Sequence, residues 1–354
     1  MYKCQKIYTE TKGRDLKNYK LSIIVPVYNG ERTLPRLIKE FNKQYDPASH
    51  SVQVFFIDDG SSDGTKDILA SLTAPFYSYS ISHQGTSGAR NYGISIASGE
   101  YIAFCDQDDD ISKYYFKKIF ATLKDNYDFY VFSKEYNFVG RDKNVDYIFD
   151  TEVLNKNTAV EKLFSSNPPQ LFATVWNCVY KTSIVKRNNV AFDTQLKHGS
   201  EDTAFNIDYL SHVETVLTSS DKLYRYNIYE SGNTIQKEND DAIEDFGVLK
   251  EHLKRLHTDK NAERFFNFRL LMHSYVKATK GKRIKINRRQ ELVESLLALD
   301  NTDDVLNFRV RFNNGNNVFY GLLRILLGFK NKFSNLIAFE LFRCLYIRFS
   351  STGL

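Results

Sequence analysis

Four carboxylates crowd into one short segment of this sequence. Asp106, Asp108, Asp109 and Asp110 follow an apolar run, 101–105, that is short enough to be one buried strand. Like charges at a strand end repel one another, and a bound divalent cation would turn that repulsion into attraction. Mg²⁺ and Mn²⁺ take hard oxygen ligands, typically one or two carboxylates together with substrate phosphates. The segment therefore predicts a strand that delivers Asp-x-Asp to a metal ion and a phosphate, and a solvated acidic turn is the alternative.

A second acidic pair, Asp58-Asp59, also ends an apolar run. Four such runs alternate with segments of helical spacing: 21–27, 52–57, 76–81 and 101–105. This alternation with short connections predicts an α/β fold with a parallel sheet. Ligands of such sheets bind at the carboxyl ends of the strands, where both acidic clusters fall. A shared binding edge is therefore favoured over two unrelated solvated turns.

The connection after the first strand excludes two common nucleotide sites. Residues 28–32 read Tyr-Asn-Gly-Glu-Arg, without Gly-x-Gly-x-x-Gly and without Gly-Lys-Thr/Ser. A dinucleotide site and a P-loop are therefore disfavoured. Aspartyl phosphatases carry Asp-x-Asp on their first strand, as a nucleophile, whereas here it follows the fourth.

Composition indicates a folded, intracellular chain. Its 354 residues are 42% hydrophobic and 26% charged, enough for a sizeable core. The four cysteines form no CxxC pair, which argues against a disulfide framework or a zinc site and fits a reducing cytoplasm. Residues 1–20 lack the apolar core of a signal peptide, and no apolar stretch approaches the ~18 residues of a membrane span.

Positive charge collects toward the carboxyl terminus. Lys277–Arg289 holds seven cations and no acid, and the residues after Val305 hold seven cations against one acid. Two apolar segments, 318–329 and 336–349, lie in this region. They are expected either to pack as a helical cap on the rest of the chain or to anchor it peripherally on an anionic membrane.

The expected organisation has three parts: an N-terminal extension at 1–20, an α/β domain at 21–230 and a mostly helical region at 231–354. Beyond Asp110 the pattern predicts a helix at 114–123, a strand at 127–133, a loop at 141–150 and a helix at 153–164.

Four motifs occur together in order and spacing: Ser22-Ile-Ile-Val-Pro-Val-Tyr-Asn29, Ile57-Asp-Asp-Gly-Ser-Ser-Asp-Gly-Thr65, Gly88-Ala-Arg-Asn91 and Gly99-Glu-Tyr-Ile-Ala-Phe-Cys-Asp-Gln-Asp-Asp109. In these motifs the chain resembles the GT-A nucleotide-sugar transferases of family 2. Cys105 departs from the Leu that is more usual there, which affects packing only. The resemblance implies a Rossmann-like sheet and a metal-dependent, inverting glycosyltransferase that moves a hexose from a UDP-sugar to a glycan or lipid-linked acceptor in bacterial surface polysaccharide synthesis.

The resemblance also implies roles for individual residues. Tyr28 would pack by the base, and Asp58 or Asp59 would hold the uracil or the ribose. Arg90 would face the diphosphate, or else form a surface ion pair. Asp108 would bind Mn²⁺ or Mg²⁺, and Asp106 would contact the ribose or the metal. The full donor set is Pro26, Tyr28, Asp58, Asp59, Arg90, Asp106 and Gln107.

A second pair of motifs, Val175–Lys181 and Gly199–Phe205, resembles the acceptor side of the same family. There Asp202 would be the general base, because inverting transfer requires that the acceptor hydroxyl lose its proton as it attacks. An ordinary helix N-cap is the alternative for Asp202. Asn177 and Glu201 would lie on the acceptor side, and Trp176 would be either the floor of that site or a core aromatic.

Two rival functions remain. The chain could be a catalytically silent subunit that binds nucleotide sugar or scaffolds a second transferase, although it keeps every expected carboxylate. A sugar nucleotidyltransferase is disfavoured because the Gly-rich N-terminal loop is missing.

The Gln-x-x-Arg-Trp signature of processive members of the family is not found, so a single sugar addition is preferred over repeated addition. The expected location is cytoplasmic, at the inner face of the cell membrane, with no nucleic-acid partner; the sequence does not indicate an oligomeric state.

Overall fold

The computed structural model describes residues 19–48, 51–141, 143–165, 171–196, 200–229, 242–256, 286–298 and 331–352, with single residues in 264–279 and 323–329. The expected N-terminal extension therefore lies almost wholly outside the described residues. Contacts divide the chain into two compact units. The sheet unit comprises Met1–Ala159, Leu171–Thr194 and Glu201–Gly232, and the helical unit comprises Val160–Gln170, Gln195–Ser200 and Asn233–Leu354.

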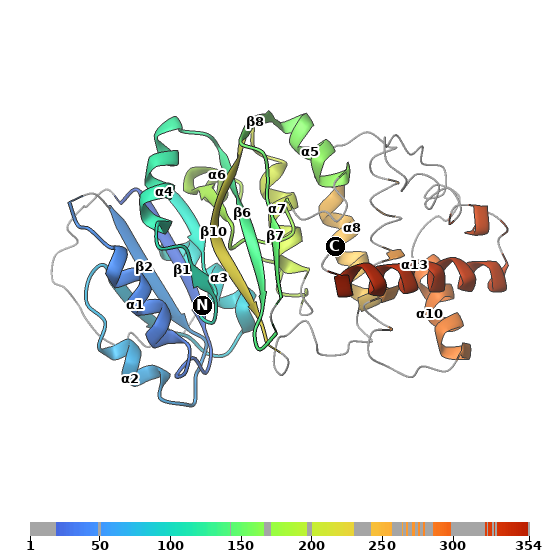
Figure 1. Cartoon of the computed structure of the whole chain (residues 1–354), viewed down its shortest axis with the longest axis horizontal. Coiled ribbons are helices and arrows are strands. Elements are labelled where there is room, and N and C mark those ends of the chain that lie inside the picture. Colours follow the sequence, from blue (N-terminus) through green and yellow to red (C-terminus); the bar gives the residue numbers. More distant parts are fainter. Residues whose placement is uncertain are drawn as a thin grey trace. The chain divides into compact units, whose positions relative to one another are not determined.

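The sheet unit is built on one mixed sheet whose strand order is β3-β2-β1-β4-β9-β6-β10-β5, with β7 beside β6 and β8 beside β10. The first half of the chain supplies β1 (Leu21–Val27), α1 (Leu34–Gln44), β2 (Val52–Asp58), α2 (Thr65–Ala70), β3 (Phe76–Ser80), α3 (Gly85–Ile96) and β4 (Tyr101–Phe104). The β1–β4 strands pair in parallel, as predicted, and their carboxyl ends meet at one edge (Figure 1).

The sheet continues past β4 with strands of mixed direction. Its elements are β5 (Asp110–Ile111), α4 (Tyr115–Thr122), the 3₁₀ helix η1 (Leu123–Asp125), β6 (Phe129–Phe138), β7 (Asn144–Tyr147), β8 (Glu152–Asn155), α5 (Lys156–Ser165), β9 (Cys178–Lys181), α6 (Thr182–Arg187), α7 (Glu201–Leu210) and β10 (Thr215–Ile228). Because β9 pairs antiparallel with both β4 and β6, the sheet is mixed rather than wholly parallel. Strands β6 and β10 nevertheless pair in parallel and run in the same direction as the first four strands.

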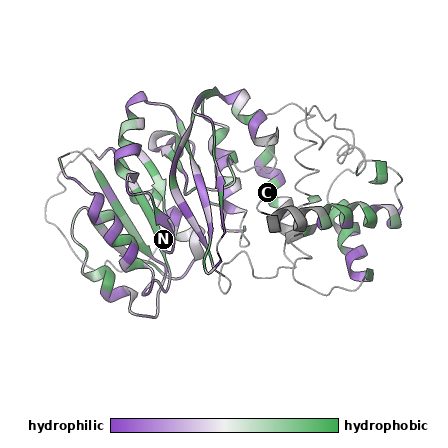
Figure 2. Ribbon diagram, in the orientation of Figure 1, coloured by the Kyte–Doolittle hydropathy of each residue, from purple (hydrophilic) through white to green (hydrophobic). Residues whose placement is uncertain are grey.

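Helices cover both faces of the sheet. On one face α1 and α4 bury Leu37, Phe41 and Phe116 against β1 and β2. On the other face α3 lies so close to β1 that a Cβ at Gly93 would come within 2.4 Å of Ile24 Cγ2. Since strand side chains alternate between faces, β1 serves both layers. Figure 2 shows β1 and β2 as hydrophobic strands, while α1 is hydrophilic on its outer side.

Two secondary-structure predictions were wrong. Residues 141–150 were expected to be a loop, but β7 forms there and pairs antiparallel with β6. Residues 153–164 were expected to be helical throughout, but β8 pairs with β10 before α5 begins at Lys156. Both short strands are mostly polar and half-exposed, so their pairing comes from long-range backbone hydrogen bonds rather than from a local apolar pattern.

The helical unit contains α8 (Ala242–Lys254), α10 (Ile286–Ala298) and α13 (Lys332–Thr352). Its core joins residues from well-separated segments, among them Tyr275, Leu296, Leu323 and Phe339. Part of the apolar carboxyl-terminal sequence therefore packs within this unit. Lys277, Lys280, Lys282, Arg283 and Lys285 lie outside the described residues. In the part of the chain that the structure describes, no helix is both long and apolar enough to cross a membrane.

Candidate active site

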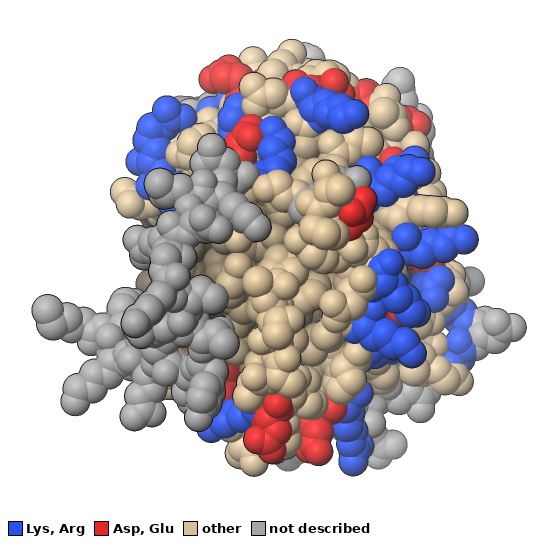
Figure 3. Space-filling view, turned by 90° about the vertical axis from the view of Figure 1, so that its left-hand side faces the viewer, with Lys and Arg blue, Asp and Glu red and all other residues tan. Residues whose placement is uncertain are grey.

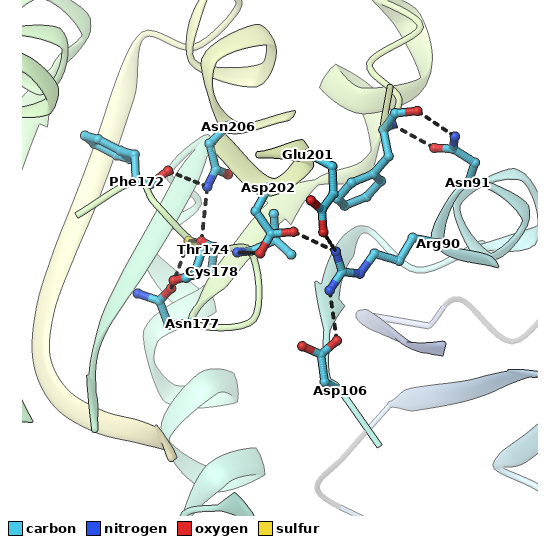
Figure 4. A network of polar contacts seen from close by, with 12 residues as sticks. Arg90, Asn91, Asp106, Phe172, Thr174, Asn177, Cys178, Glu201, Asp202 and Asn206 are labelled. Atoms are coloured by element: carbon cyan, nitrogen blue, oxygen red, sulfur yellow. Dashed lines mark hydrogen bonds and ion pairs between the residues drawn. The ribbon is translucent and has the colours of Figure 1, made fainter. Parts of the chain in front are cut away.

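Arg90 joins the two acidic motifs that the sequence places far apart. Its guanidinium is delivered by the first half of α3 and is only 2% exposed. Arg90 Nη2 donates to Asp106 Oδ1 at 2.8 Å, and Nη1 donates to Asp202 Oδ1 at 2.6 Å (Figure 4). Glu201 Oε1 lies 3.6 Å from the same Nη1, and the Phe192 ring lies 5.1 Å from Arg90 Cζ. One buried cation thus holds the end of β4 against the start of α7.

The charges around Arg90 are unbalanced, with three carboxylates facing one guanidinium. Burial is the main cause that raises the pKa of Asp202, opposed by Arg90. Burial, followed by the charge of Asp202, raises the pKa of Glu201 to about 7. Their side chains keep 16% and 18% exposure, so a ligand can reach them. A carboxylate with a raised pKa and solvent access suits a general base.

The second carboxylate oxygen of Asp202 is also held. The Val175 backbone N–H donates to Asp202 Oδ2 at 3.2 Å. The Thr174 carbonyl next to it accepts from Asn206 Nδ2 at 3.1 Å, and Asn206 lies on the same helix as Asp202. The 174–177 loop and α7 are therefore fastened together around the carboxylate, as Figure 4 shows.

Only part of the acidic run after β4 remains available for a ligand. Asp109 is 1% exposed and accepts from the Tyr224 hydroxyl and the Asn227 N–H, both at 2.8 Å. Asp110 pairs with Arg36 Nε at 3.2 Å. These two residues fasten the run to β10 and α1. They leave Asp108 and the second carboxylate oxygen of Asp106, whose Oδ1 accepts from Arg90.

Asp108 is the residue of this run that was predicted to bind a cation. Burial, followed by the charge of Asp106, raises its pKa to about 6, and a hydrogen bond from its own backbone N–H and the charge of Arg36 oppose the rise. Among the described residues, no group of three or more His, Cys, Asp and Glu side chains is arranged to hold a metal. Two neighbouring carboxylates fit a Mg²⁺ or Mn²⁺ ion that arrives with substrate phosphates as its other ligands.

Asp58 and Asp59 are brought to the same sheet edge but are already engaged. Asp58 accepts from the Ser61 N–H at 3.0 Å and the Ser80 hydroxyl at 2.9 Å. Asp59 accepts from the Gln84 and Gly85 N–H groups, at 2.7 and 2.8 Å, where α3 begins. Burial raises the pKa of Asp59, and these backbone donors oppose the rise. Contact of either carboxylate with uracil or ribose stays a prediction.

Tyr28 stands at the edge with an exposed ring. It is 47% exposed, and its ring centroid lies 4.7 Å from that of His83. Its backbone exchanges two hydrogen bonds with Gln107, at 3.2 and 2.8 Å, which tie the ends of β1 and β4 together. Pro26 is buried within β1, two residues before Tyr28. The paired Tyr28 and His83 rings offer a stacking surface for a planar base.

Trp176 and Asn177 lie in the core. Trp176 is 3% exposed and stacks on Tyr224 and Tyr226, with ring centroids 4.5 and 5.5 Å away. Asn177 is 2% exposed and donates to the Phe132 carbonyl at 2.8 Å. Of the two alternatives for Trp176, the structure supports the core aromatic, and contact of Asn177 with an acceptor stays a prediction.

From the sequence, His83 is expected to be incidental rather than a ligand, and Lys134 is not singled out. The structure places the His83 ring beside Tyr28, after the third strand. Lys134 carries no local signal, because it lies in the mostly polar second half of β6, and only the fold buries it beside the 174–177 loop.

The face of the sheet unit drawn in Figure 3 carries charges of both signs around a largely uncharged centre.

Comparisons with known proteins find similarity to glycosyltransferases. Residues 22–188 match the family model described as glycosyl transferase family 2. The chain is 27% identical over 256 residues to the uncharacterized glycosyltransferase EpsJ of Bacillus subtilis, covering 70% of each chain. It is 25% identical over 287 residues to the poly(ribitol-phosphate) β-N-acetylglucosaminyltransferase TarS of Staphylococcus aureus, covering 77% of this chain and 47% of TarS.

Solved structures show the same fold. The crystal structure of S. aureus TarS 1–349 superposes with a TM-score of 0.68 at 17% identity, covering 93% of this chain and 91% of that one. The same TarS fragment in complex with UDP-GlcNAc gives a TM-score of 0.66 at 18% identity, covering 93% of this chain and 92% of that one. The predicted GT-A fold is thereby confirmed.

Proposed function

Because residues 22–188 match the glycosyl transferase family 2 model and similar proteins are glycosyltransferases, we propose that the chain belongs to this family. It would move a hexose from a UDP-sugar to a glycan or lipid-linked acceptor, with inversion at the anomeric carbon. The observation that carries this proposal is the Arg90 guanidinium between Asp106, at the end of β4, and Asp202, at the start of α7. It places a donor-side carboxylate and a candidate base on the two sides of one buried cation. Because TarS was solved with UDP-GlcNAc, this donor is the first to test.

The proposed reaction is a single displacement. The acceptor hydroxyl attacks the anomeric carbon, the bond from that carbon to the diphosphate oxygen breaks, and UDP leaves with the electron pair. Asp202 takes the hydroxyl proton as the new glycosidic bond forms. An α-linked donor then gives a β-linked product. Arg90 fixes one oxygen of the base and Val175 fixes the other, so the carboxylate is oriented before the acceptor arrives.

Asp108, helped by Asp106, is the proposed holder of Mn²⁺ or Mg²⁺. When bound, such an ion supplies positive charge that stabilises the departing diphosphate. The protein contributes two adjacent carboxylates, one of them with its pKa raised to about 6, and keeps Asp109 and Asp110 engaged elsewhere.

We also propose that the enzyme works at the inner face of the cell membrane, beside a lipid-linked acceptor. Four of the exposed large hydrophobic residues fall in one short stretch: Ile325, Phe329, Phe333 and Ile337 are 60%, 66%, 75% and 38% exposed. The acids Glu340 and Glu294 are both paired: Glu340 with Arg289 and Arg343, and Glu294 with Lys332. Exposed apolar side chains among basic residues suit an anionic lipid surface.

A donor screen tests the proposed function. Purified protein is incubated with UDP-GlcNAc, UDP-glucose, UDP-galactose and GDP-mannose, with and without Mn²⁺, and release of the nucleoside diphosphate is measured. UDP release from one UDP-sugar that depends on Mn²⁺ supports the proposal. UDP binding without turnover in every condition would favour the catalytically silent subunit.

A further inference from the structure

Lys134 is a buried lysine beside the candidate base. It lies on β6 with no exposed surface, and the Trp176 ring lies 5.1 Å from its ammonium nitrogen. Burial lowers the pKa of Lys134 to about 7, and the charges of Cys178 and Asp202 oppose this effect. Taking an ammonium group out of water is costly, so a lysine kept at such a position calls for a structural or chemical reason.

A short chain of contacts connects Lys134 to Asp202. Lys134 Nζ donates to Thr174 Oγ1 at 2.7 Å, and that hydroxyl donates to Asn177 Oδ1 at 2.6 Å. The Asn177 amide donates in turn to the Phe132 carbonyl on β6. The loop is thereby fastened to β6 at both of its ends. Val175, between these anchors, donates its N–H to Asp202 Oδ2 at 3.2 Å.

We propose that Lys134 is a positioning residue for Asp202: it fixes the 174–177 loop so that the Val175 N–H orients the carboxylate for proton transfer from the acceptor. This inference rests on the proposed function, because it assigns a role only if Asp202 is the base. Arg90 restrains one carboxylate oxygen and the Lys134 contact chain restrains the other. Losing either restraint lets the carboxylate rotate away from the acceptor hydroxyl.

Several charged or titratable groups surround Asp202. Arg90 approaches from α3, Asp106 from the end of β4, Glu201 from α7, and Cys178 and Tyr180 from β9. Lys134 supplies positive charge from β6. A cation near a carboxylate lowers the pKa of that carboxylate, so Lys134 has an electrostatic effect as well as a geometric one.

Three variants separate these effects. K134M keeps the length of the side chain but removes both the charge and the hydrogen bond. K134R keeps the charge, and T174V removes the hydroxyl while leaving the lysine in place. K186M is the matched control, because Lys186 also has a pKa lowered by burial and donates to a carbonyl, that of Ala97 at 2.6 Å, away from Asp202.

The measurements are UDP release across pH with the best donor of the screen, UDP affinity in Mn²⁺ by calorimetry, and thermal unfolding. K134M should lower kcat by about 10–100-fold and change UDP affinity by no more than about 2-fold, since misplacement of a catalytic group affects the chemical step. The acidic limb of its kcat profile should move to higher pH. T174V should lower kcat without moving that limb, K134R should restore part of the K134M loss, and K186M should match the wild type.

Wild-type kcat with an unmoved acidic limb in folded K134M and T174V would overturn the role of Lys134. If K134M fails to fold, T174V and K134R carry the test. D202N is measured in parallel. Full turnover in D202N would remove the base assignment itself, whereas an inactive D202N with fully active K134M and T174V would remove only this inference.

Discussion

The Arg90 guanidinium lies 2.6 Å from the Asp202 carboxylate, although the two residues are 112 positions apart. The same guanidinium binds Asp106, so a single side chain fixes the distance between the donor-side motif and the acceptor-side motif. Burial acts to lower the pKa of Arg90, but the negative charges of Asp202, Asp106 and Glu201 outweigh it and raise the pKa above its usual value. Arg90 is therefore a cation under all practical conditions.

Arg90→Lys should fold but lose most of its turnover. Lysine keeps the positive charge among the three carboxylates, but one ammonium group cannot reproduce the fork that reaches Asp106 and Asp202 at once. Arg90→Met should instead unfold at much lower temperature, because breaking a buried ion pair by removing one partner costs about 3–5 kcal/mol. Thermal unfolding and UDP release check both variants. If Arg90→Lys and Arg90→Met were equally stable, the positive charge among the three carboxylates would not contribute to the stability of the fold.

Asp202→Asn should retain UDP binding and lose transfer by ~10²–10⁴-fold, because an amide cannot accept the acceptor proton. Glu201→Gln is the matched neighbour: it removes the carboxylate that lies 3.6 Å from Arg90 but leaves Asp202 intact. It should reduce turnover less. The check is UDP release with a defined acceptor. A wild-type rate in Asp202→Asn would leave Asp202 as only a structural partner of Arg90 and Val175.

Asp108→Ala should abolish the enhancement of UDP affinity by Mn²⁺ while keeping the fold. The variant removes the carboxylate that Asp106 repels, so the apoprotein should be no less stable than the wild type. Asp110→Ala is the control, because its carboxylate is paired with Arg36. Calorimetry with UDP in Mn²⁺ and in EDTA decides; undiminished metal dependence in Asp108→Ala would place the metal elsewhere.

Tyr28→Ala should weaken UDP binding and leave kcat at saturating donor nearly unchanged. The exposed ring beside His83 is expected to stack on the uracil, and stacking of a base on an aromatic ring is worth about 1–3 kcal/mol. Tyr28→Phe should bind UDP as the wild type does. Tyr114→Ala, which removes another exposed tyrosine, is the control. An unchanged KM for the donor in Tyr28→Ala would exclude the stacking role.

Phe329→Ser/Phe333→Ser should reduce binding to anionic vesicles. Both rings are more than 60% exposed, and each nearby cation adds ~1 kcal/mol of attraction to an anionic leaflet. Wild-type protein should float with phosphatidylglycerol liposomes at low salt and be released by high salt. Ile148→Ser, at an exposed position in the sheet unit, should float as the wild type does.

Light scattering tests whether this exposed apolar surface binds a second copy of the chain instead of a membrane. If the double variant changes the mass of the protein in solution but leaves flotation unaltered, the apolar residues join copies of the chain. If the wild type never floats, the membrane location is wrong, and the transferase activity is unaffected by that result.

Sequence alone determined the first four strands and the residues at their carboxyl ends. Continuous apolar runs such as Leu21–Val27 become central strands because both faces of a parallel sheet are buried. Polar residues directly after such runs must then meet at one edge, which brings Asp58 and Asp108 to the same edge of the sheet. These features follow from short-range patterns that a single sequence displays.

Tertiary structure decided everything that depends on which distant segments meet. It paired the polar strands β7 and β8, enclosed Trp176 between Tyr224 and Tyr226, and assigned Asp109 to β10 rather than to a ligand. It also brought Lys134 to Thr174 and Arg90 to Asp202, pairs separated by 40 and 112 positions. No local spacing encodes such contacts, because the partner of a buried charge is chosen by the packing of the whole sheet, where leaving that charge alone would cost several kcal/mol.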